Sequence, residues 1–321
     1  GETVLKEINF DGIIGPSHNY AGLSLGNIAS ASHRGQTSHP REAALQGLAK
    51  MRGNMARGLP QGILLPLPRP NGVLGDALAL DGTEDPALRA APWSASAMWT
   101  ANAATVSPAP DTRDGRCHLT PANLITMLHR AQEWQDTKAQ LDIAFGDAKH
   151  FAVHDAVPPT FGDEGAANHM RLCESHGEAG VEVFVYGKPG GKFPARQHEQ
   201  ASRAVARMHG LDPKRTVFIE QNPEAIEAGA FHNDVVAVAN ERVLFTHARA
   251  FADPQGAYGA IREAFPTLEL VEVPESAVSL EEAIRTYLFN AQLLTLPDGT
   301  MALVVPSECR ESTSVWGFCE Q

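Results

Sequence analysis

Two short strings in the sequence place acids or a histidine in surroundings that suit proton transfer. Asp163 and Glu164 lie among small residues in Gly162–His169, where a ligand can approach the backbone and a carboxylate can orient a histidine. His232 lies in Phe231–Asp234, directly before an apolar run, and an imidazole at a strand end can act as an acid or a base near neutral pH. An acidic turn at a helix start and an ordinary turn histidine are the alternatives. These two segments alone do not decide between the functional interpretation and these alternatives.

Two arginines and an asparagine have side chains suited to binding polar groups. Arg130, next to His129, and Arg196 carry planar guanidinium groups that can clamp a carboxylate with two hydrogen bonds. Asn102 lies in Met98–Thr105, which has the same small-residue composition as the acidic string. Because exposed arginines are usually solvated, a surface role is the alternative for both.

The string Gly22–Gly26 matches the G-x-S-x-G pattern of a nucleophilic serine, and the order Ser24, Glu164, His232 fits an α/β-hydrolase. That fold needs several strands before its nucleophile, whereas about one fits before Gly22. We therefore interpret this string as a glycine-permitted loop, with or without a ligand. The acids lack the His-Glu-x-x-His spacing of a zinc site, and no glycine-rich nucleotide loop occurs. No metal and no cofactor is predicted.

Short β-branched runs bounded by turn residues predict the strands that would position these side chains. Asn240-Glu241 and Pro297-Gly299 are predicted hairpin turns. The predicted strands are Val4–Phe10, Gly62–Leu67, Leu141–Phe145, Val181–Tyr186, Val217–Glu220, Val235–Ala239, Arg242–Thr246, Leu268–Val273 and Met301–Val305.

Capping residues predict four helices. One follows Thr120-Pro121 and carries His129 and Arg130 near its end. A second follows the capping box of Ser279 and Glu282 and continues to Ala291. The other two span Arg41–Arg57, with Leu45, Leu48, Met51 and Met55 on one face, and Ala195–His209, with Ala201, Val205 and Met208 inward. Residues 66–92 are predicted to be a long surface loop. Hairpins mixed with helices indicate an α/β or α+β fold in one domain, residues 1–321.

The composition excludes several classes of function. The 26 Lys and Arg against 38 Asp and Glu give a net charge of −12, which is unsuited to nucleic acid or anionic lipid. No apolar run approaches the roughly 18 residues of a membrane span. Four cysteines without a C-x-x-C pair favour a reduced, cytoplasmic chain.

Taken together, the strings resemble the N-succinylarginine dihydrolase family. The similar segments are Ile8–Asn27, Met98–Thr105, Gly162–His169, Phe231–Asp234 and Tyr287–Leu294. They occur in the same order and span essentially the whole chain. The resemblance implies the pentein α/β-propeller fold, with ββαβ units around a central active site. It also implies a hydrolase of arginine catabolism that converts N2-succinylarginine to N2-succinylornithine, carbon dioxide and two ammonia molecules, in a homodimer and without a cofactor.

The same resemblance assigns roles to particular residues. Glu164 and His232 would be two members of a Cys-His-Glu catalytic set, in which a thiolate attacks the guanidinium carbon. Asp234 would face the guanidinium, and Arg130 and Arg196 the succinyl and α-carboxylates. The implied substrate contacts are Ala21, Gly22, Leu23, Ser24, Leu25, Gly26, Asn27, Ile28, Ala29, Ser30, Asn102, His129, Arg130, Arg196 and Asp234.

One departure from the family concerns the nucleophile. In the family, the catalytic cysteine lies in a glycine-rich C-terminal segment beyond the region of Trp316–Phe318, and this sequence stops at Gln321. Cys309 and Cys319 belong to other contexts and are not assigned as the nucleophile. Two hypotheses follow: a hydrolase whose nucleophile lies outside these residues, or a truncated, non-catalytic remnant that binds N2-succinylarginine. In the second case the last ββαβ unit would be incomplete. Arginine and agmatine are the alternative substrates.

Overall fold

The computed structural model describes residues 7–18, 37–95, 103–193 and 196–321. Three parts of the chain repeat one order of elements: an antiparallel hairpin, a helix, and a third strand parallel to the second strand of the hairpin. A helix connects the second and third strands because parallel strands cannot be joined by a tight turn. The repeated elements are β3 (Ala104–Ser107), β4 (Cys117–Pro121), α5 (Trp134–Ala144) and β5 (Phe151–Val153); β6 (His169–Leu172), β7 (Val181–Tyr186), α6 (Glu199–Met208) and β8 (Thr216–Glu220); and β9 (Ala237–Asn240), β10 (Val243–His247), α8 (Pro254–Ala264) and β11 (Glu269–Val273).

Two further groups of elements follow part of the same order. β1 (Asn9–Gly12), α2 (Pro40–Ala56) and β2 (Gln61–Leu64) form a parallel strand pair with its crossover helix. β12 (Gln292–Thr295) and β13 (Met301–Val304) form an antiparallel hairpin, followed by two short helices. The remaining helices are α3 (Gly72–Ala77), α4 (Pro86–Ala90), α7 (Pro223–Glu227), α9 (Leu280–Thr286), α10 (Glu308–Glu311) and α11 (Thr313–Cys319). The 3₁₀ turns are η1 (Ala91–Trp93), η4 (Ala109–Asp111), η5 (Pro159–Phe161), η6 (Ala166–Asn168), η7 (Pro213–Arg215), η8 (Asn233–Val235) and η9 (Leu288–Asn290).

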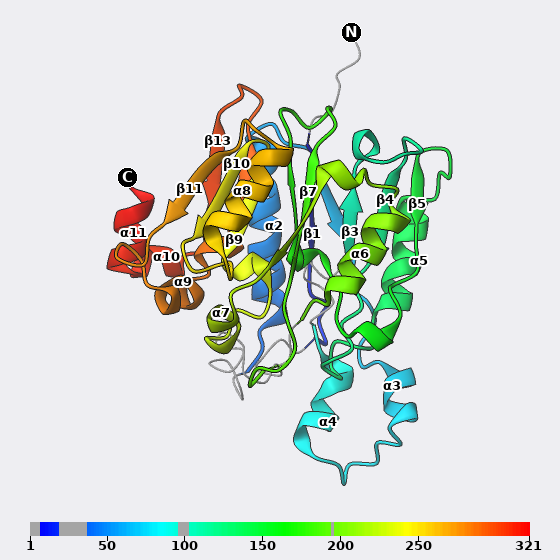
Figure 1. The fold of residues 1–321 in the computed structure, drawn as a ribbon. Helices are drawn as coiled ribbons and strands as arrows, with labels where there is room; N and C mark the ends of the chain where they lie inside the picture. Colours follow the sequence, from blue (N-terminus) through cyan, green and yellow to red (C-terminus); the bar gives the residue numbers. More distant parts are fainter. Residues whose placement is uncertain (1–6, 19–36, 96–102, 194–195) are drawn as a thin grey trace.

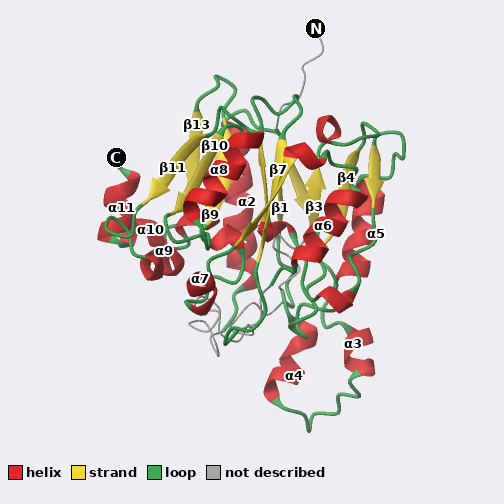
Figure 2. Ribbon diagram, in the orientation of Figure 1, coloured by secondary structure: helices red, strands yellow, loops and turns green. Residues whose placement is uncertain are grey.

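The sheets stand side by side across the molecule, with α5 at one edge and α10 and α11 at the other (Figure 1). The α3–α4 segment projects away from the sheets, and α5, α6 and α8 lie beside the strands of their own units (Figure 2). The repeated ββαβ order agrees with the predicted pentein class.

The core is built on both faces of β7. Val183 and Val185 pack in the largest buried cluster together with Leu244 of β10, whereas Phe184 faces the other way and packs against Val205 of α6. All five side chains are essentially inaccessible to solvent. Burying each one contributes about 1.5 to 3 kcal/mol, so β7 holds two neighbouring units together.

Most predicted strands are confirmed within a few residues, although residues 4–6 of the first one lie outside the described residues. Leu141–Phe145 is wrong as a strand because residues 134–144 form the helix α5. Leu141 is buried while Ile143 is 87% exposed. In a strand these two residues would lie on the same face, so the difference in exposure fits a helix. A short apolar run in the sequence does not distinguish a helix from a strand. Val235 lies in η8 rather than in a strand, and β9 begins at Ala237.

The helix predicted after Thr120-Pro121 is also wrong. Thr120 is the partner of Thr105 in the antiparallel pair β3–β4, and residues 124–131 form turns. Pairing with a strand distant in the sequence overrides a local capping signal. His129 and Arg130 therefore lie in a turn segment, not in a helix.

The other helices are confirmed with changes. The predicted Arg41–Arg57 helix is α2, which is followed by Gly58 at φ +84, a left-handed conformation that suits glycine. Met51 of this helix is buried, but its other predicted inward residues, Leu45, Leu48 and Met55, are exposed. In α6, Met208 is likewise 37% exposed. In α9, Ser279 caps the backbone as predicted, yet the helix ends at Thr286. The segment predicted as a loop at residues 66–92 contains α3 and α4.

Candidate active site

Glu164 is held by β3 and by the segment that follows β4. Its backbone exchanges two hydrogen bonds with Asn123, which follows β4: Asn123 N donates to Glu164 O at 2.8 Å, and Glu164 N donates to Asn123 O at 2.7 Å. Its side chain accepts a hydrogen bond from Thr105 Oγ1 of β3 at 2.9 Å. The residue is 1% exposed. Burial raises the pKa of Glu164 to about 8, and the Thr105 hydrogen bond opposes that shift.

Asp163, the neighbour of Glu164, anchors an arginine. Its Oδ1 accepts from Thr126 N at 2.8 Å, and its Oδ2 lies 3.4 Å from Arg196 Nη1. The same Nη1 donates to Thr126 Oγ1 at 3.0 Å, and the guanidinium lies over the Phe231 ring, 5.0 Å from its centroid. Arg196 is the largest fully buried side chain of the described residues. A buried cation fixed in this way can bind an anionic group with little loss of entropy.

The segment with His129 and Arg130 brings a second cation to Asp163. Burial lowers the pKa of Arg130 to about 10, while the Asp163 and Asp234 carboxylates favour its charge and Arg196 opposes it. Burial lowers the pKa of His129 to about 4, and both arginines add to this effect. Gln132 ties the segment to the base of the α3–α4 projection, because its Nε2 donates to both His129 O and Ala91 O at 2.9 Å.

His232 and Asp234 flank Asn233 at the start of η8. Burial lowers the pKa of His232 well below its usual value, and the Arg130 and Arg196 charges lower it further. His232 is therefore a neutral imidazole in this structure, the form that accepts a proton. Burial raises the pKa of Asp234 to about 7 against the attraction of Arg130. The two groups share the electrostatic influence of Arg130, although Arg130 lies about a hundred residues away in the sequence.

Two buried amides join the three segments of the site. Asn168 Oδ1 accepts from Asn233 N at 3.0 Å, next to His232. Gln197 Oε1, next to Arg196, accepts from Gly165 N at 3.2 Å and from Asn168 Nδ2 at 3.4 Å. Gln197 Nε2 donates to Ser202 Oγ at 2.9 Å. The Glu164, Arg196 and His232 segments are thereby fixed relative to one another.

Five buried polar atoms of these segments have no hydrogen-bond partner within the described part of the chain: Asn123 Oδ1, Glu164 Oε2, Arg196 Nε, His232 Nε2 and Asn233 Oδ1. A buried polar group without a partner is costly and needs an explanation. A polar ligand at this place supplies one.

The cysteines are in other surroundings. Cys117 begins β4, Cys173 follows β6, and Cys309 and Cys319 lie in α10 and α11. Burial raises the pKa of Cys117 and of Cys309 to about 11, opposite to the shift that activates a nucleophilic thiol. Cys309 Sγ instead donates to Thr286 O at 3.3 Å. Neither environment is that of a nucleophile, in agreement with leaving Cys309 unassigned.

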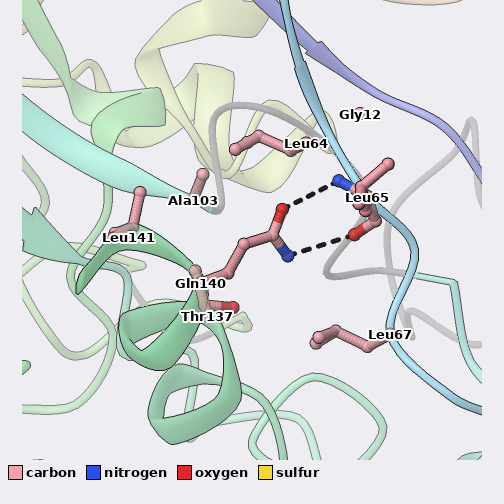
Figure 3. A pocket seen from close by; sticks show the side chains of 8 residues that line it. All are labelled: Gly12, Leu64, Leu65, Leu67, Ala103, Thr137, Gln140 and Leu141. Atoms are coloured by element: carbon pink, nitrogen blue, oxygen red, sulfur yellow. Dashed lines mark hydrogen bonds between the residues drawn. The ribbon is translucent and has the colours of Figure 1, made fainter. Parts of the chain in front are cut away.

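A small cavity and a groove lie apart from the site residues described above. Figure 3 shows a cavity of about 20 Å³ between β2 and α5, where Gln140 exchanges hydrogen bonds of 2.8 and 3.1 Å with the backbone of Leu65. An apolar groove of about 340 Å³ includes Val271, Leu303 and Phe318 in its lining. The first is too small for an amino-acid derivative and the second lacks charged groups. No cluster of metal-ligating side chains occurs in residues 7–18, 37–95, 103–193 and 196–321.

Of the predicted site residues, the structure places Glu164, His129, Arg130, Arg196, His232 and Asp234 in the segments described above. The predicted contacts in Ala21–Ser30 and Asn102 lie outside the described residues. Sequence reasoning missed Thr105, Thr126, Asn168 and Gln197 as structural partners of the site. Their types are common and no spacing relates them to Glu164, so only the similarity of Met98–Thr105 and Gly162–His169 to family segments pointed to two of them.

The fold is shared with enzymes of known structure. The chain superimposes on the N-terminal domain of ArgZ bound to substrate, an arginine dihydrolase from the ornithine–ammonia cycle in cyanobacteria, with a TM-score of 0.55 and 16% identity, over 89% of this chain and 79% of that one. Apo ArgZ gives a TM-score of 0.57 at 14% identity, over 89% and 33%. At this identity the comparison shows the fold, and the predicted pentein-type α/β class is confirmed.

The chain belongs to the succinylarginine dihydrolase family. The family's sequence model, Succinylarginine dihydrolase, matches residues 4–321. The N-succinylarginine dihydrolase of Novosphingobium aromaticivorans is 69% identical over 321 residues, which cover 98% of this chain and 76% of that protein. That of Sphingopyxis alaskensis is 63% identical, over 99% and 76%. The predicted family and the hydrolase class are confirmed.

Proposed function

We propose that the protein hydrolyses N2-succinylarginine to N2-succinylornithine, carbon dioxide and two ammonia molecules, with Glu164 and His232 of this chain as catalytic residues. The observation that supports these roles is the arrangement of charge. The buried Arg196 and the partly buried Arg130 act electrostatically on His232, and Arg130 also acts on Asp234, while Glu164 is tied to the same segments through Gly165 and Gln197. The substrate carries one guanidinium and two carboxylates, which such a set complements.

The substrate is proposed to lie with its guanidinium against Asp234 and Glu164. Its succinyl and α-carboxylates would then meet Arg130 and Arg196, with His129 beside them. The Ala21–Ser30 loop and Asn102 are proposed to complete the contacts. A neutral His129 next to Arg130 suits this role, because a second fixed positive charge would compete with the arginine for its partners.

The chemistry proposed follows from these positions. A cysteine thiolate attacks the guanidinium carbon, and the C–N bond breaks as His232 gives a proton to the departing ammonia. His232 then removes a proton from the water that attacks the covalent intermediate, and the C–S bond breaks to return the thiolate and leave a ureido group. A second round on this group releases the other ammonia, and the carbamate that results breaks down to N2-succinylornithine and carbon dioxide. The nucleophile is proposed to be the cysteine of the family's glycine-rich segment and not one of the four cysteines of this chain.

His232 must hold a proton at the step in which ammonia leaves, yet burial, and to a smaller extent the Arg130 and Arg196 charges, lower its pKa without substrate. The substrate reduces this difficulty, because its carboxylates neutralise the two arginine charges that add to the effect of burial. The bound substrate would therefore help to protonate its own general acid.

Ammonia release from N2-succinylarginine, measured on the protein produced from its natural gene, tests the catalytic roles. Glu164→Gln and His232→Ala should each lower kcat at least about a hundredfold, whereas the exposed controls Glu320→Gln and His150→Ala should not change it. Unchanged turnover in Glu164→Gln and His232→Ala would remove the assignments. Binding of N2-succinylarginine without turnover in the unsubstituted protein would instead support the non-catalytic remnant. Parallel assays with arginine and agmatine test the substrate.

The remaining expectations are also proposals: one domain over residues 1–321, a homodimer, and a cytoplasmic location. Among the described residues, no helix combines the length and the apolar composition of a membrane span. Light scattering coupled to size-exclusion chromatography tests the dimer, and a monomer mass at micromolar concentration would contradict it.

A further inference from the structure

A threonine on β3 contacts the carboxylate of Glu164. Thr105 Oγ1 donates to Glu164 Oε1 at 2.9 Å, and both residues are at most 1% exposed. Glu164 Oε2 has no hydrogen-bond partner within the described residues. The two oxygens of this carboxylate therefore differ: Oε1 accepts a hydrogen bond from Thr105, and Oε2 is buried without a partner among the described residues.

The position of this hydroxyl is fixed by the sheet. Thr105 lies inside β3, opposite Thr120 of β4 in the antiparallel register, so its backbone is held within the strand. The side chain is branched at Cβ, which restricts its first torsion angle. Since the backbone of Glu164 is bound to Asn123, two residues beyond β4, one small sheet fixes both the backbone and the carboxylate of Glu164.

Neighbouring polar side chains on this face of the sheet serve other partners. Ser107 and Thr120 point to the same side as Thr105, because alternate residues and directly opposed residues share a face. Both bind His209: Thr120 Oγ1 lies 2.7 Å from Nε2, and Ser107 Oγ 2.7 Å from Nδ1. Thr120 is as fully buried as Thr105. It is therefore a matched position whose hydroxyl is not bound to Glu164.

We propose that Thr105 is a positioning residue for Glu164. The Thr105 hydroxyl holds Oε1 of Glu164 and leaves Oε2 of Glu164 to receive the guanidinium of the substrate. This inference rests on the proposed function of Glu164. The bond also favours the charged carboxylate against its burial, and so it keeps the pKa of Glu164 from rising further. Without the hydroxyl, Glu164 would keep its proton to a higher pH and bind a cation less well.

Calorimetric titration of N2-succinylarginine between pH 6 and pH 9.5 tests this inference without requiring turnover. Affinity should rise with pH as Glu164 ionises. In Thr105→Val that rise should move about one to two pH units higher, with about tenfold weaker binding at pH 7. Thr105→Ser keeps the hydroxyl and should restore the original pH profile. Thr120→Val should lower the melting temperature and leave the pH profile unchanged. If Thr105→Val does not fold, as judged by circular dichroism, Thr105→Ala is titrated in its place.

The outcomes separate the two claims. A Thr105→Val profile that coincides with that of the unsubstituted chain, while Glu164→Gln abolishes the pH dependence, would overturn the role of Thr105 alone. A shift of equal size in Thr120→Val would also overturn it, because it would show a general effect of buried hydroxyls. If Glu164→Gln binds with the original affinity and pH profile, the proposed function of Glu164 fails, and the inference fails with it.

Discussion

Burial shifts the pKa values of individual side chains in the site toward their neutral forms. Burial raises the pKa of Glu164 to about 8 and that of Asp234 to about 7, and lowers the pKa of His232. A guanidinium placed beside the two carboxyls would favour their ionised forms. The substrate therefore changes the protonation of the residues that bind it.

The first prediction is that binding of N2-succinylarginine at pH 7 releases protons. Without ligand, Glu164 is mostly protonated and Asp234 about half protonated at this pH, since their pKa values lie above or near it. Ionisation of both on binding should release about 1.4 protons, and uptake of one proton by His232 would leave a net release of about 0.4. The binding enthalpies measured in phosphate and in Tris should differ by the number of protons released, multiplied by the difference between the ionisation enthalpies of the two buffers. Equal enthalpies in the two buffers would contradict the ionisation of these carboxyls.

At the scale of elements, the site depends on how separate segments are tied together. Glu164 precedes η6, Arg196 precedes α6, and His232 precedes η8. Gln197 binds Gly165 N and Asn168 Nδ2, and Asn168 in turn binds Asn233 N. These buried amides connect three segments, and no single helix or strand determines the positions of all three.

The second prediction concerns Gln197→Leu. Loss of the amide leaves Gly165 N and Asn168 Nδ2 unsatisfied, which should lower the free energy of unfolding by about 2 to 3 kcal/mol. It should also weaken N2-succinylarginine binding about tenfold, because three binding segments lose their alignment. Gln140→Leu is the control: it removes two hydrogen bonds to Leu65 and should reduce stability without changing affinity. Equal affinity losses in the two variants would refute the alignment role.

Features set by a short stretch of sequence could be predicted, whereas contacts between residues far apart in the sequence could not. Glu164 and His232 could be proposed because each lies in a short string similar to the family. β7 and β10 could be predicted from local apolar runs. Thr105 could not be connected with Glu164, since a hydroxyl 59 residues away leaves no pattern in the sequence. The helix predicted after Thr120 failed for the same reason: the pairing of Thr120 with Thr105 is set by the tertiary structure.

At the scale of the whole molecule, His176 joins segments that are distant in the sequence. Its Nε2 lies 3.6 Å from Glu7 Oε2 and 3.6 Å from Glu241 Oε1. Glu7 also accepts hydrogen bonds from Asn240 Nδ2 at 3.0 Å and from Thr295 N at 3.1 Å. The Cys173 thiol and the Glu7 carboxylate raise the pKa of His176 to about 9. A protonated histidine thus links the first described residues to β9, β10 and β12.

The third prediction is a pH-dependent contribution of His176 to stability. A group whose pKa is higher in the folded chain contributes fully below its unfolded value of 6.5 and loses its contribution as pH rises through about 9. His176→Gln should therefore lower the free energy of unfolding by about 1 to 2 kcal/mol at pH 6 and by little at pH 10. Urea denaturation of both proteins at the two pH values measures this. A difference that grows with pH would contradict the charged form of His176.

We propose one binding site for N2-succinylarginine in the whole molecule, formed by the Glu164, His232 and Asp234 segments and the two arginines. Calorimetric titration of this ligand at pH 8 into the unsubstituted chain and into Asp234→Asn tests the claim most directly. We predict saturable binding to the unsubstituted chain and at least about tenfold weaker binding to Asp234→Asn, because a buried guanidinium would lose its anionic partner. Glu320→Gln should bind like the unsubstituted chain. Equal affinity in all three proteins, or no binding in any of them, would contradict the account.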